Sequence, residues 1–166
     1  MLAQHFLASM RKVAGAVCVI TTVGQQGERR GLTATAVCSL SAAPPSLIVC
    51  VNQATWVAQL VGDAGVFAVN VLSDFQEDVA RAFAGHTDLA AEERFSVGSW
   101  ETRLTGAPVA SDALASFECK LEREIVHTTH TILIGQVVGT TLGDGRSLVY
   151  LDGNFSTVAG PILPSR

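Results

Sequence analysis

The segment ALASFECKLEREI, residues 113–125, alternates small or apolar side chains with polar ones. Successive side chains of a β-strand point to opposite faces of a sheet, so this period of two predicts a strand with one buried face. The face expected in the core carries Ala115, Phe117, Cys119 and Leu121. The face expected in solvent carries Ser116, Glu118, Lys120 and Glu122.

Six further runs have a composition typical of strands, and most are bounded by Gly, Pro, Asn or Asp. They are AVCVITTV (16–23), GLTATAVCSL (31–40), SLIVCVN (46–52), GVFAVNVL (65–72), TILIGQVVGTTL (131–142) and SLVYLD (147–152). Seven strands in 166 residues predict a mainly β fold, and we expect one domain, residues 1–166, built as a β-barrel with peripheral helices.

One helix is expected within SDFQEDVARAFAG, residues 73–85, where Ser73 and Gln76 have the spacing of a capping box and Gly85 provides the stop. Its buried face is expected to carry Phe75, Val79 and Phe83. Two shorter helices are predicted over residues 4–12 and, beginning at Thr55, over residues 55–65.

The composition excludes several classes of protein. A net charge of −4 and only two lysines, Lys12 and Lys120, argue against a nucleic-acid surface, and the pair Arg29 and Arg30 is interpreted as the solvated tip of a hairpin. With 16% charged and 48% hydrophobic residues, some apolar surface is expected to meet a second subunit, as in a homodimer. No signal peptide or membrane-spanning run is found.

The four cysteines, Cys18, Cys38, Cys50 and Cys119, lie far apart in apolar runs without a C-x-x-C pair. They are expected to be buried, reduced thiols, which favours a cytoplasmic protein. No metal site is expected, because His127 and His130 lack further ligands at suitable spacing and, on one strand, would face opposite sides. Trp56 and Trp100 are expected in the core or in a subunit interface rather than as stacking platforms.

The segment GLTATAVCSLSAAPPS, residues 31–46, has no charged residue and nothing larger than leucine. Its threonines and alanines alternate where core strands usually place larger side chains, which leaves space beside the strand. Asn52 and Thr55 then precede a helix, whose N-terminus favours an anion. A flat ring that carries a phosphate would fit such a site; the alternative is that residues 33–36 are ordinary strand residues and Thr55 only caps the helix.

Residues 31–55, GLTATAVCSLSAAPPSLIVCVNQAT, are similar to the signature of the flavin reductase family with an FMN-binding split β-barrel. These proteins are the small reductase components of two-component flavin-dependent monooxygenases, such as the 4-hydroxyphenylacetate and phenol hydroxylases. The similarity continues through FLASMRKVAGAVCVITT (6–22), FAVNVLSDFQEDVARAFAG (67–85), EERFSVGSW (92–100), SFECKLE (116–122), THTILIGQV (129–137) and LVYLDGNF (148–155).

The resemblance implies a homodimer that uses NADH or NADPH to reduce FMN, FAD or riboflavin, and we expect the flavin close to the subunit interface. Positions that match the family's flavin contacts are Thr33, Ala34, Thr35, Ala36, Ser39, Val51, Asn52, Thr55, Phe83, Ala84 and Gly85. His130 matches the family histidine at the nicotinamide, and Tyr150 and Arg94 match positions near that nucleotide. Relatives commonly carry Arg and His where this chain has GNFS, residues 153–156, so two positive groups are missing.

Hydride transfer requires little from the protein beyond positioning, since the cofactor carries the reactivity. His130 is therefore expected to hydrogen-bond the nicotinamide nucleotide, the alternative being a purely structural bond at a strand end. The leading function is an NAD(P)H:flavin oxidoreductase that supplies reduced flavin to a monooxygenase. The alternatives are a flavin-binding carrier or sensor without turnover, and a reductase of a metal-centred acceptor such as a corrin.

Overall fold

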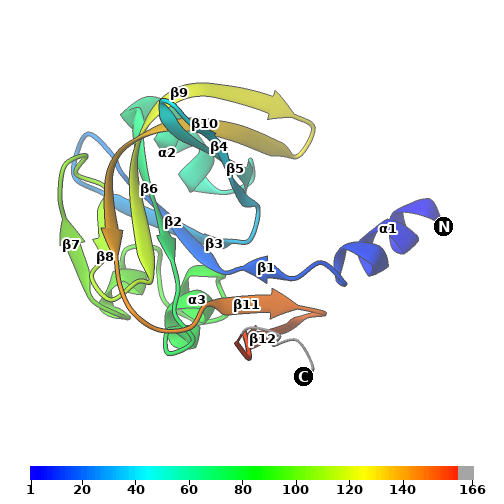
Figure 1. Ribbon diagram of the computed structural model, residues 1–166. Helices are drawn as coiled ribbons and strands as arrows, with labels where there is room; N and C mark the ends of the chain where they lie inside the picture. The colour runs from blue at the N-terminus through cyan, green and yellow to red at the C-terminus, as the bar shows by residue number, and fades with distance from the viewer. Residues whose placement is uncertain (161–166) are drawn as a thin grey trace.

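A computed structural model describes residues 1–160 of the chain, and the fold is mainly β (Figure 1). Its helices are α1 (Leu2–Met10), α2 (Trp56–Ala64) and α3 (Glu77–Phe83), with a 3-10 turn η1 (Glu93–Ser96). The helices predicted at 4–12, 55–65 and 73–85 are confirmed, although α3 begins only at Glu77. Within residues 1–160 no helix is long and apolar enough to cross a membrane.

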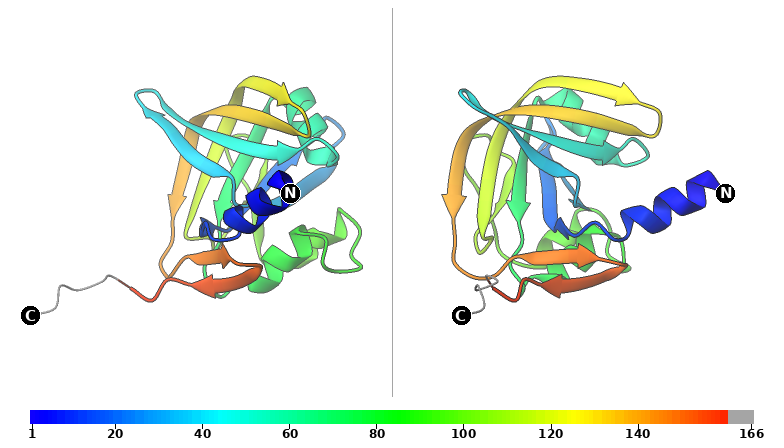
Figure 2. Two further views of the ribbon diagram at one scale, coloured as in Figure 1. Left: turned by 90° about the vertical axis from the view of Figure 1, so that its right-hand side faces the viewer. Right: turned by 45° about the vertical axis from the view of Figure 1, so that its right-hand side comes forward.

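Seven strands form the main sheet, in the order β3-β2-β6-β9-β10-β5-β4, with every neighbouring pair antiparallel. Their bounds are β2 (Cys18–Val23), β3 (Arg29–Ala34), β4 (Val37–Ala42), β5 (Pro45–Asn52), β6 (Val66–Val71), β9 (Ala115–His127) and β10 (His130–Leu142). The sheet curls into a barrel, as the two views of Figure 2 show, and a cluster of buried apolar side chains forms its core. The predicted barrel with peripheral helices is confirmed.

The barrel is open between its two edge strands, β3 and β4, which are consecutive in the sequence. The prediction of one strand over residues 31–40 is wrong, because the chain leaves the sheet after Ala34 and enters it again at Val37. Thr35 and Ala36 form the bend that carries the chain from one edge of the sheet to the other. The expected small-residue segment therefore lines the gap of a split barrel.

Two smaller sheets cover the outside of the barrel. One contains β1 (Gly15–Ala16), β11 (Leu148–Leu151) and β12 (Asn154–Thr157), and the other contains β7 (Trp100–Thr102) and β8 (Pro108–Ala110). The hairpin of β7 and β8 corrects one prediction, because it buries Ser116 and Glu118 on the face of β9 that was expected in solvent. Glu118 accepts hydrogen bonds from the backbone N–H and the hydroxyl of Thr105, at 2.8 and 2.9 Å, which satisfy its buried carboxylate.

Helix α2 packs Val57, Ala58 and Val61 into the apolar core of the barrel. Helix α3 packs outside the barrel against a second apolar cluster and buries Val79 and Phe83 as predicted. Phe75 was expected on the same face, but it precedes the helix and is 84% exposed. The Ser73 backbone N–H still donates to the Gln76 side chain at 2.9 Å, so half of the predicted capping box forms one turn ahead of the helix.

The cysteine prediction is confirmed for two residues and wrong for the others. Cys18 and Cys119 are buried, whereas Cys50 is half-buried and Cys38 is exposed on edge strand β4. Burial raises the pKa of Cys18 to about 12, and burial together with the charge of Glu118 raises the pKa of Cys119 to about 12. These two thiols therefore stay protonated and unreactive near neutral pH.

Candidate functional site

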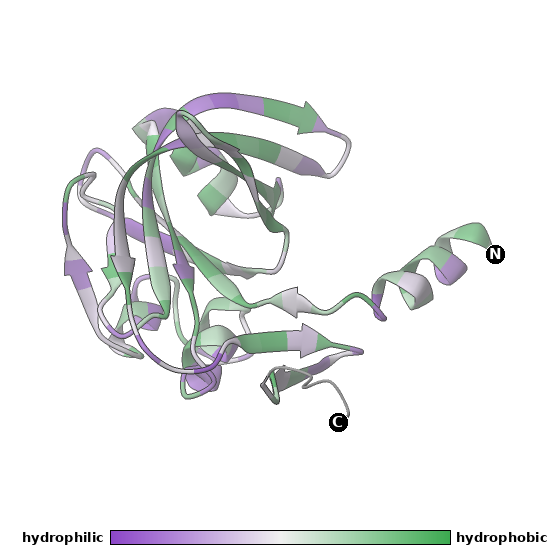
Figure 3. Cartoon of the chain, viewed as in Figure 1, coloured by the Kyte–Doolittle hydropathy of each residue, from purple (hydrophilic) through white to green (hydrophobic). Residues whose placement is uncertain are grey.

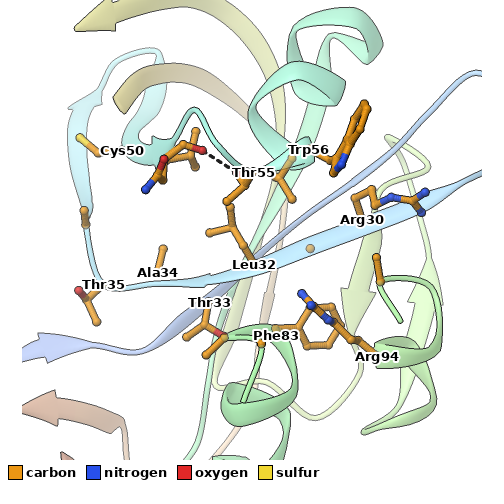
Figure 4. Close-up of a pocket in the computed structure, with 18 of the residues that line it drawn as sticks. Arg30, Leu32, Thr33, Ala34, Thr35, Cys50, Thr55, Trp56, Phe83 and Arg94 are labelled. Atoms are coloured by element: carbon orange, nitrogen blue, oxygen red, sulfur yellow. Dashed lines mark hydrogen bonds between the residues drawn. The ribbon is translucent and has the colours of Figure 1, made fainter. Parts of the chain in front are cut away.

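A cavity of about 590 Å³ lies beside edge strand β3 and the bend that follows it (Figure 4). Its walls come from β3 and the following bend, the end of β5, the start of α2 and the end of α3. The residues that line it are Arg30, Gly31, Leu32, Thr33, Ala34, Thr35, Ala36, Cys50, Val51, Asn52, Thr55, Trp56, Val57, Phe83, Ala84, Gly85, Ala91, Arg94 and His130. The set includes all but two of the site residues expected from the sequence.

The floor of the cavity is the small-residue segment over residues 33–36. The Thr33 hydroxyl donates to the carbonyl of Ala80 at 2.7 Å and fixes the strand to α3. Thr35 packs against Gly15 of β1, where a Cβ would lie only 2.8 Å from the Cβ of Thr35. Ala34 and Ala36 contribute only methyl groups, so the floor of the cavity leaves room for a flat ligand.

The turn between β5 and α2 forms a second wall. The Asn52 side-chain oxygen accepts a hydrogen bond from the Ala54 backbone N–H at 2.9 Å, and the Thr55 hydroxyl donates to the Asn52 carbonyl at 2.6 Å. Thr55 occupies the N-cap position of α2, but its side chain does not cap the helix. The first N–H groups of a helix have no partner within it, and at this helix end they border the cavity.

The end of α3 closes the cavity from the opposite side. Phe83 is held by Phe95 and Trp100, with ring centroids 4.9 and 5.1 Å away. Gly31 lets β3 approach this cluster, since a Cβ there would lie 2.6 Å from a Phe83 ring carbon. Gly85 has a φ of 78°, the left-handed conformation that glycine adopts easily after a helix end.

The charged residues of the cavity are all basic. Arg30 and Arg94 lie at the same end, opposite Thr35 and Cys50, in Figure 4. None of the described lining residues is acidic, although the whole chain carries a net charge of −4. The Arg94 Nε is buried and has no hydrogen-bond partner among the described residues. This end of the cavity therefore suits an anionic group.

Arg30 corrects the interpretation of the Arg29 and Arg30 pair as a solvated tip. The turn itself lies over residues 24–28, and the Gly24 N–H donates to the Glu28 carbonyl at 2.9 Å. Outside the cavity, Glu92 accepts from the Arg29 Nε at 2.7 Å and lies 3.4 Å from Arg30 Nη1. Desolvation tends to raise the pKa of Glu92, but hydrogen bonds from Arg29 and the charges of both arginines lower it overall.

His130 lies at the rim of the cavity, where its Nδ1 is 2.9 Å from the Thr129 hydroxyl. The prediction that His127 and His130 face opposite sides is wrong. They belong to different strands, β9 and β10, and pair directly across the hairpin, so they share one face of the sheet. Within residues 1–160 no three His, Cys, Asp or Glu side chains are grouped as metal ligands.

The structure does not bring two expected residues to this cavity. Ser39 lies on edge strand β4, outside the lining. Tyr150 lies on β11 beside Phe155 and lines a neighbouring recess of about 290 Å³ together with His86. That recess shares Thr33, Ala34, Thr35 and Ala84 with the cavity, so the two hollows meet at the small-residue segment.

Seven lining residues were not expected from the sequence, namely Arg30, Gly31, Leu32, Cys50, Trp56, Val57 and Ala91. Arg30 follows Arg29 in a turn-like segment, where nothing in the local pattern separates a cavity residue from a surface one. Trp56 is not in the core, since its side chain is 75% exposed at the cavity edge, and the other expectation, a subunit interface, stays a prediction. Trp100, in contrast, is half-buried in the aromatic cluster, as expected.

Comparisons with known proteins agree with this geometry. The family model described as "Flavin reductase like domain" matches residues 10–159. The chain is 38% identical to an FMN reductase (NADH) of Ancylobacter novellus over 95% of this chain and 86% of that protein. It is 40% identical to an FMN reductase (NADH) of Agrobacterium fabrum over 89% of this chain and 83% of that one.

A solved structure is similarly close. The NADH:FAD oxidoreductase of Streptomyces globisporus, in complex with NAD and FAD fragments, superposes with a TM-score of 0.85. It is 30% identical, and the match covers 95% of this chain and 93% of that one. Since the family model and the curated relatives both match nearly the whole chain, this protein belongs to the flavin reductase family.

Proposed function

We propose that this protein is an NAD(P)H:flavin oxidoreductase that reduces FMN or FAD and supplies the reduced flavin to a partner monooxygenase. One observation carries the proposal. The cavity has small residues at one end and two arginines at the other, and none of its described lining residues is acidic. A flavin mononucleotide has the same two parts, a flat ring and a phosphate. Membership of the flavin reductase family supports the same ligand.

Different residues of the cavity would bind different parts of the flavin. Residues 33–36 would lie against the ring, because Ala34 and Ala36 leave it room. The start of α2, with Asn52 and Thr55, and the guanidinium groups of Arg30 and Arg94 would hold the phosphate. Phe83, Ala84 and Gly85 would cover the remaining side, and Val51 would support the wall from the core.

A flavin held in this cavity would supply the hydride-accepting chemistry, with a nicotinamide nucleotide as the donor. The contribution of the protein is positioning. Backbone N–H groups near Thr35 would stabilise negative charge on the ring, and His130 would orient the nicotinamide nucleotide from the rim of the cavity. Tyr150 is proposed to contact the nucleotide from the adjoining recess, and Ser39 to contact the flavin only if a second subunit brings it close.

A homodimer forms part of the proposal. Helix α1 stands away from the barrel, and Figure 3 shows hydrophobic residues along it. None of its residues is buried, and Phe6 and Leu7 are about 60% exposed. An isolated helix of nine residues is not stable in water, so α1 needs a partner surface, which a second copy of the chain would provide.

The proposal also covers the cellular location, the domain organisation and the delivery of the reduced flavin. We place the protein in the cytoplasm, which its four unpaired thiols support. We treat residues 1–166 as one domain, supported by the family match over residues 10–159. The monooxygenase partner is proposed to receive reduced flavin by diffusion.

The test is the oxidation of NADH and NADPH with and without added FMN or FAD. Oxidation that depends on added flavin is expected, and turnover that no flavin affects would favour a carrier or sensor. Ala36→Phe is expected to weaken FMN binding in a fluorescence titration because the ring space is filled, whereas Ala42→Phe, exposed and outside the cavity, serves as the control. Unchanged FMN affinity in Ala36→Phe would remove the bend from the site. Faster electron transfer to a corrin than to free flavin would favour the remaining alternative.

A further inference from the structure

Trp56 is a large aromatic side chain at the open end of the cavity. It is the first residue of α2 and is 75% exposed. Figure 4 shows it beside Arg30, on the side of the cavity opposite Thr35 and Cys50. No aromatic ring within residues 1–160 pairs with it, so both faces of the indole lack an aromatic neighbour.

Another recess, which we call the outer recess, has a volume of about 300 Å³ and lies beyond Trp56. Its lining residues are Glu28, Arg30, Trp56, Gln59, Leu60 and Asp63. Arg30 and Trp56 also line the main cavity, so the two hollows adjoin along these two side chains. A ligand that leaves the main cavity past Arg30 therefore enters this recess.

The two hollows differ in charge. The described lining of the main cavity has no acidic residue, whereas the outer recess has the carboxylates of Glu28 and Asp63. Carboxylates repel a phosphate but accept hydrogen bonds from hydroxyl and amino groups. The recess therefore suits a neutral group with such donors, attached to a phosphate that remains at Arg30.

An adenosine group has these properties. Its base offers a flat face for stacking on an indole and an amino group as donor, and its ribose offers two hydroxyls. A carboxylate that accepts from ribose hydroxyls is a common arrangement in dinucleotide sites. Along the two hollows the small residues come first, then the arginine, then the indole with the carboxylates. A flavin adenine dinucleotide has its parts in the matching order of ring, phosphates and adenosine.

We propose that the recess beyond Trp56 is an adenosine subsite, which makes FAD rather than FMN the preferred flavin; the inference rests on the proposed function. Trp56 is the specificity-determining residue, because it provides the stacking surface. The adenosine could also belong to the nicotinamide dinucleotide, and the experiment separates the two sources.

The experiment measures dissociation constants by fluorescence titration for FMN, for FAD, and for NAD⁺ with protein saturated by FMN. Stacking on an aromatic ring makes a difference of about tenfold or more in affinity. Trp56→Ala is expected to raise the FAD to FMN ratio of dissociation constants by about tenfold, and Trp56→Phe to restore most of the preference. Phe75→Ala is the matched control, since Phe75 is an exposed aromatic outside both hollows.

Each outcome decides the proposal. A raised FAD to FMN ratio assigns the subsite to FAD, and a weaker NAD⁺ affinity at an unchanged ratio assigns it to the nicotinamide dinucleotide. If Trp56→Ala changes neither the FAD to FMN ratio of dissociation constants nor the affinity for NAD⁺, the adenosine subsite is overturned while the flavin cavity stands. Dissociation into monomers without a change in selectivity would make Trp56 a subunit contact and also overturn it. A wild-type protein that binds neither flavin overturns the proposed function itself.

Discussion

Helices α1 and α2 both contain nine residues and are both rich in apolar side chains, yet they have opposite environments. Helix α2 buries Val57, Ala58 and Val61 inside the barrel, whereas α1 buries no residue. Helix α2 ends at Gly65 in a left-handed conformation, while α1 is held near its end by Arg11 and Lys12, which pair with Asp152.

The difference shows that amphipathic composition alone does not tell which surface a helix will cover. Short helices gain their stability from packing rather than from intrinsic propensity. For α2 the packing surface is in the same chain, where it also positions one wall of the cavity. For α1 the surface is proposed to lie on a second subunit, so changes in the two helices should affect different measurements.

The largest effect is expected from the double change Phe6→Ser and Leu7→Ser in α1. Burial of a Phe or Leu side chain is worth about 1.5 to 3 kcal/mol, so the dimer dissociation constant should rise at least about a hundredfold. Sedimentation at micromolar concentration measures it, with His5→Ser on the same helix as the control. A double variant that sediments as the wild type does would show that α1 is not a subunit contact.

A smaller effect, on the folding of each chain, is expected from Val61→Ala in α2. Val61 is fully buried in the barrel, and the truncation should lower the free energy of unfolding by about 2 to 3 kcal/mol. Urea denaturation measures the change. Leu142→Ala, at an exposed position, should cost less than about 0.5 kcal/mol, and equal losses for the two would contradict the packing of α2.

Arg94→Gln tests whether the cavity that α2 borders holds the flavin phosphate. A charge-assisted hydrogen bond to phosphate should be lost, so FMN affinity is expected to fall about tenfold relative to riboflavin, which has no phosphate. Fluorescence titration measures both ligands. Arg103→Gln removes an arginine that pairs with Glu101 outside the cavity, and a similar loss there would mean that the effect is one of net charge.

The smallest effect is expected at the attachment of α1. Hydrogen bonds from Lys12 and Arg11 lower the pKa of Asp152 below its ordinary 3.8. A lowered folded pKa means that the stabilisation is present above the ordinary value and is lost as the pH falls through the folded value. Exchange of the Asp152 amide, which donates to the Arg11 carbonyl at 2.8 Å, should therefore show less protection in that acidic range. Asp152→Asn should have low protection already at neutral pH, and a protected amide in that variant would contradict the role of the ion pairs.

The sequence predicts the fold best where buried and exposed residues alternate along a single strand. The alternation over residues 113–125 locates β9, although the strand continues to His127. The burial of Ser116 and Glu118 could not be predicted, because the covering hairpin, β7 and β8, has strands of three residues with too few positions for a period. The break after Ala34 was missed because Thr and Ala alternate straight through it.

For the site, the sequence locates the small-residue wall and the turn before α2, since both depend on consecutive residues. Arg30 and Trp56 could not be assigned from local pattern, because the cavity that they share is formed by β3 and α2, which are distant in sequence. His127 and His130 illustrate the same limit: a turn of two residues between them reverses the chain and places both on one face.

Because of the bend at Thr35 and Ala36, the width of the cavity can change without a change in how the strands pair. Elsewhere in the main sheet an inserted residue would shift a hydrogen-bonded ladder and move side chains to the wrong face. Between β3 and β4 no ladder pairs are formed, and in the bend the Ala36 carbonyl accepts from the Cys50 N–H at 3.0 Å, so an insertion or deletion there would disturb few backbone hydrogen bonds. Evolution can therefore widen or narrow the floor of this site for different ligands without changing the barrel around it.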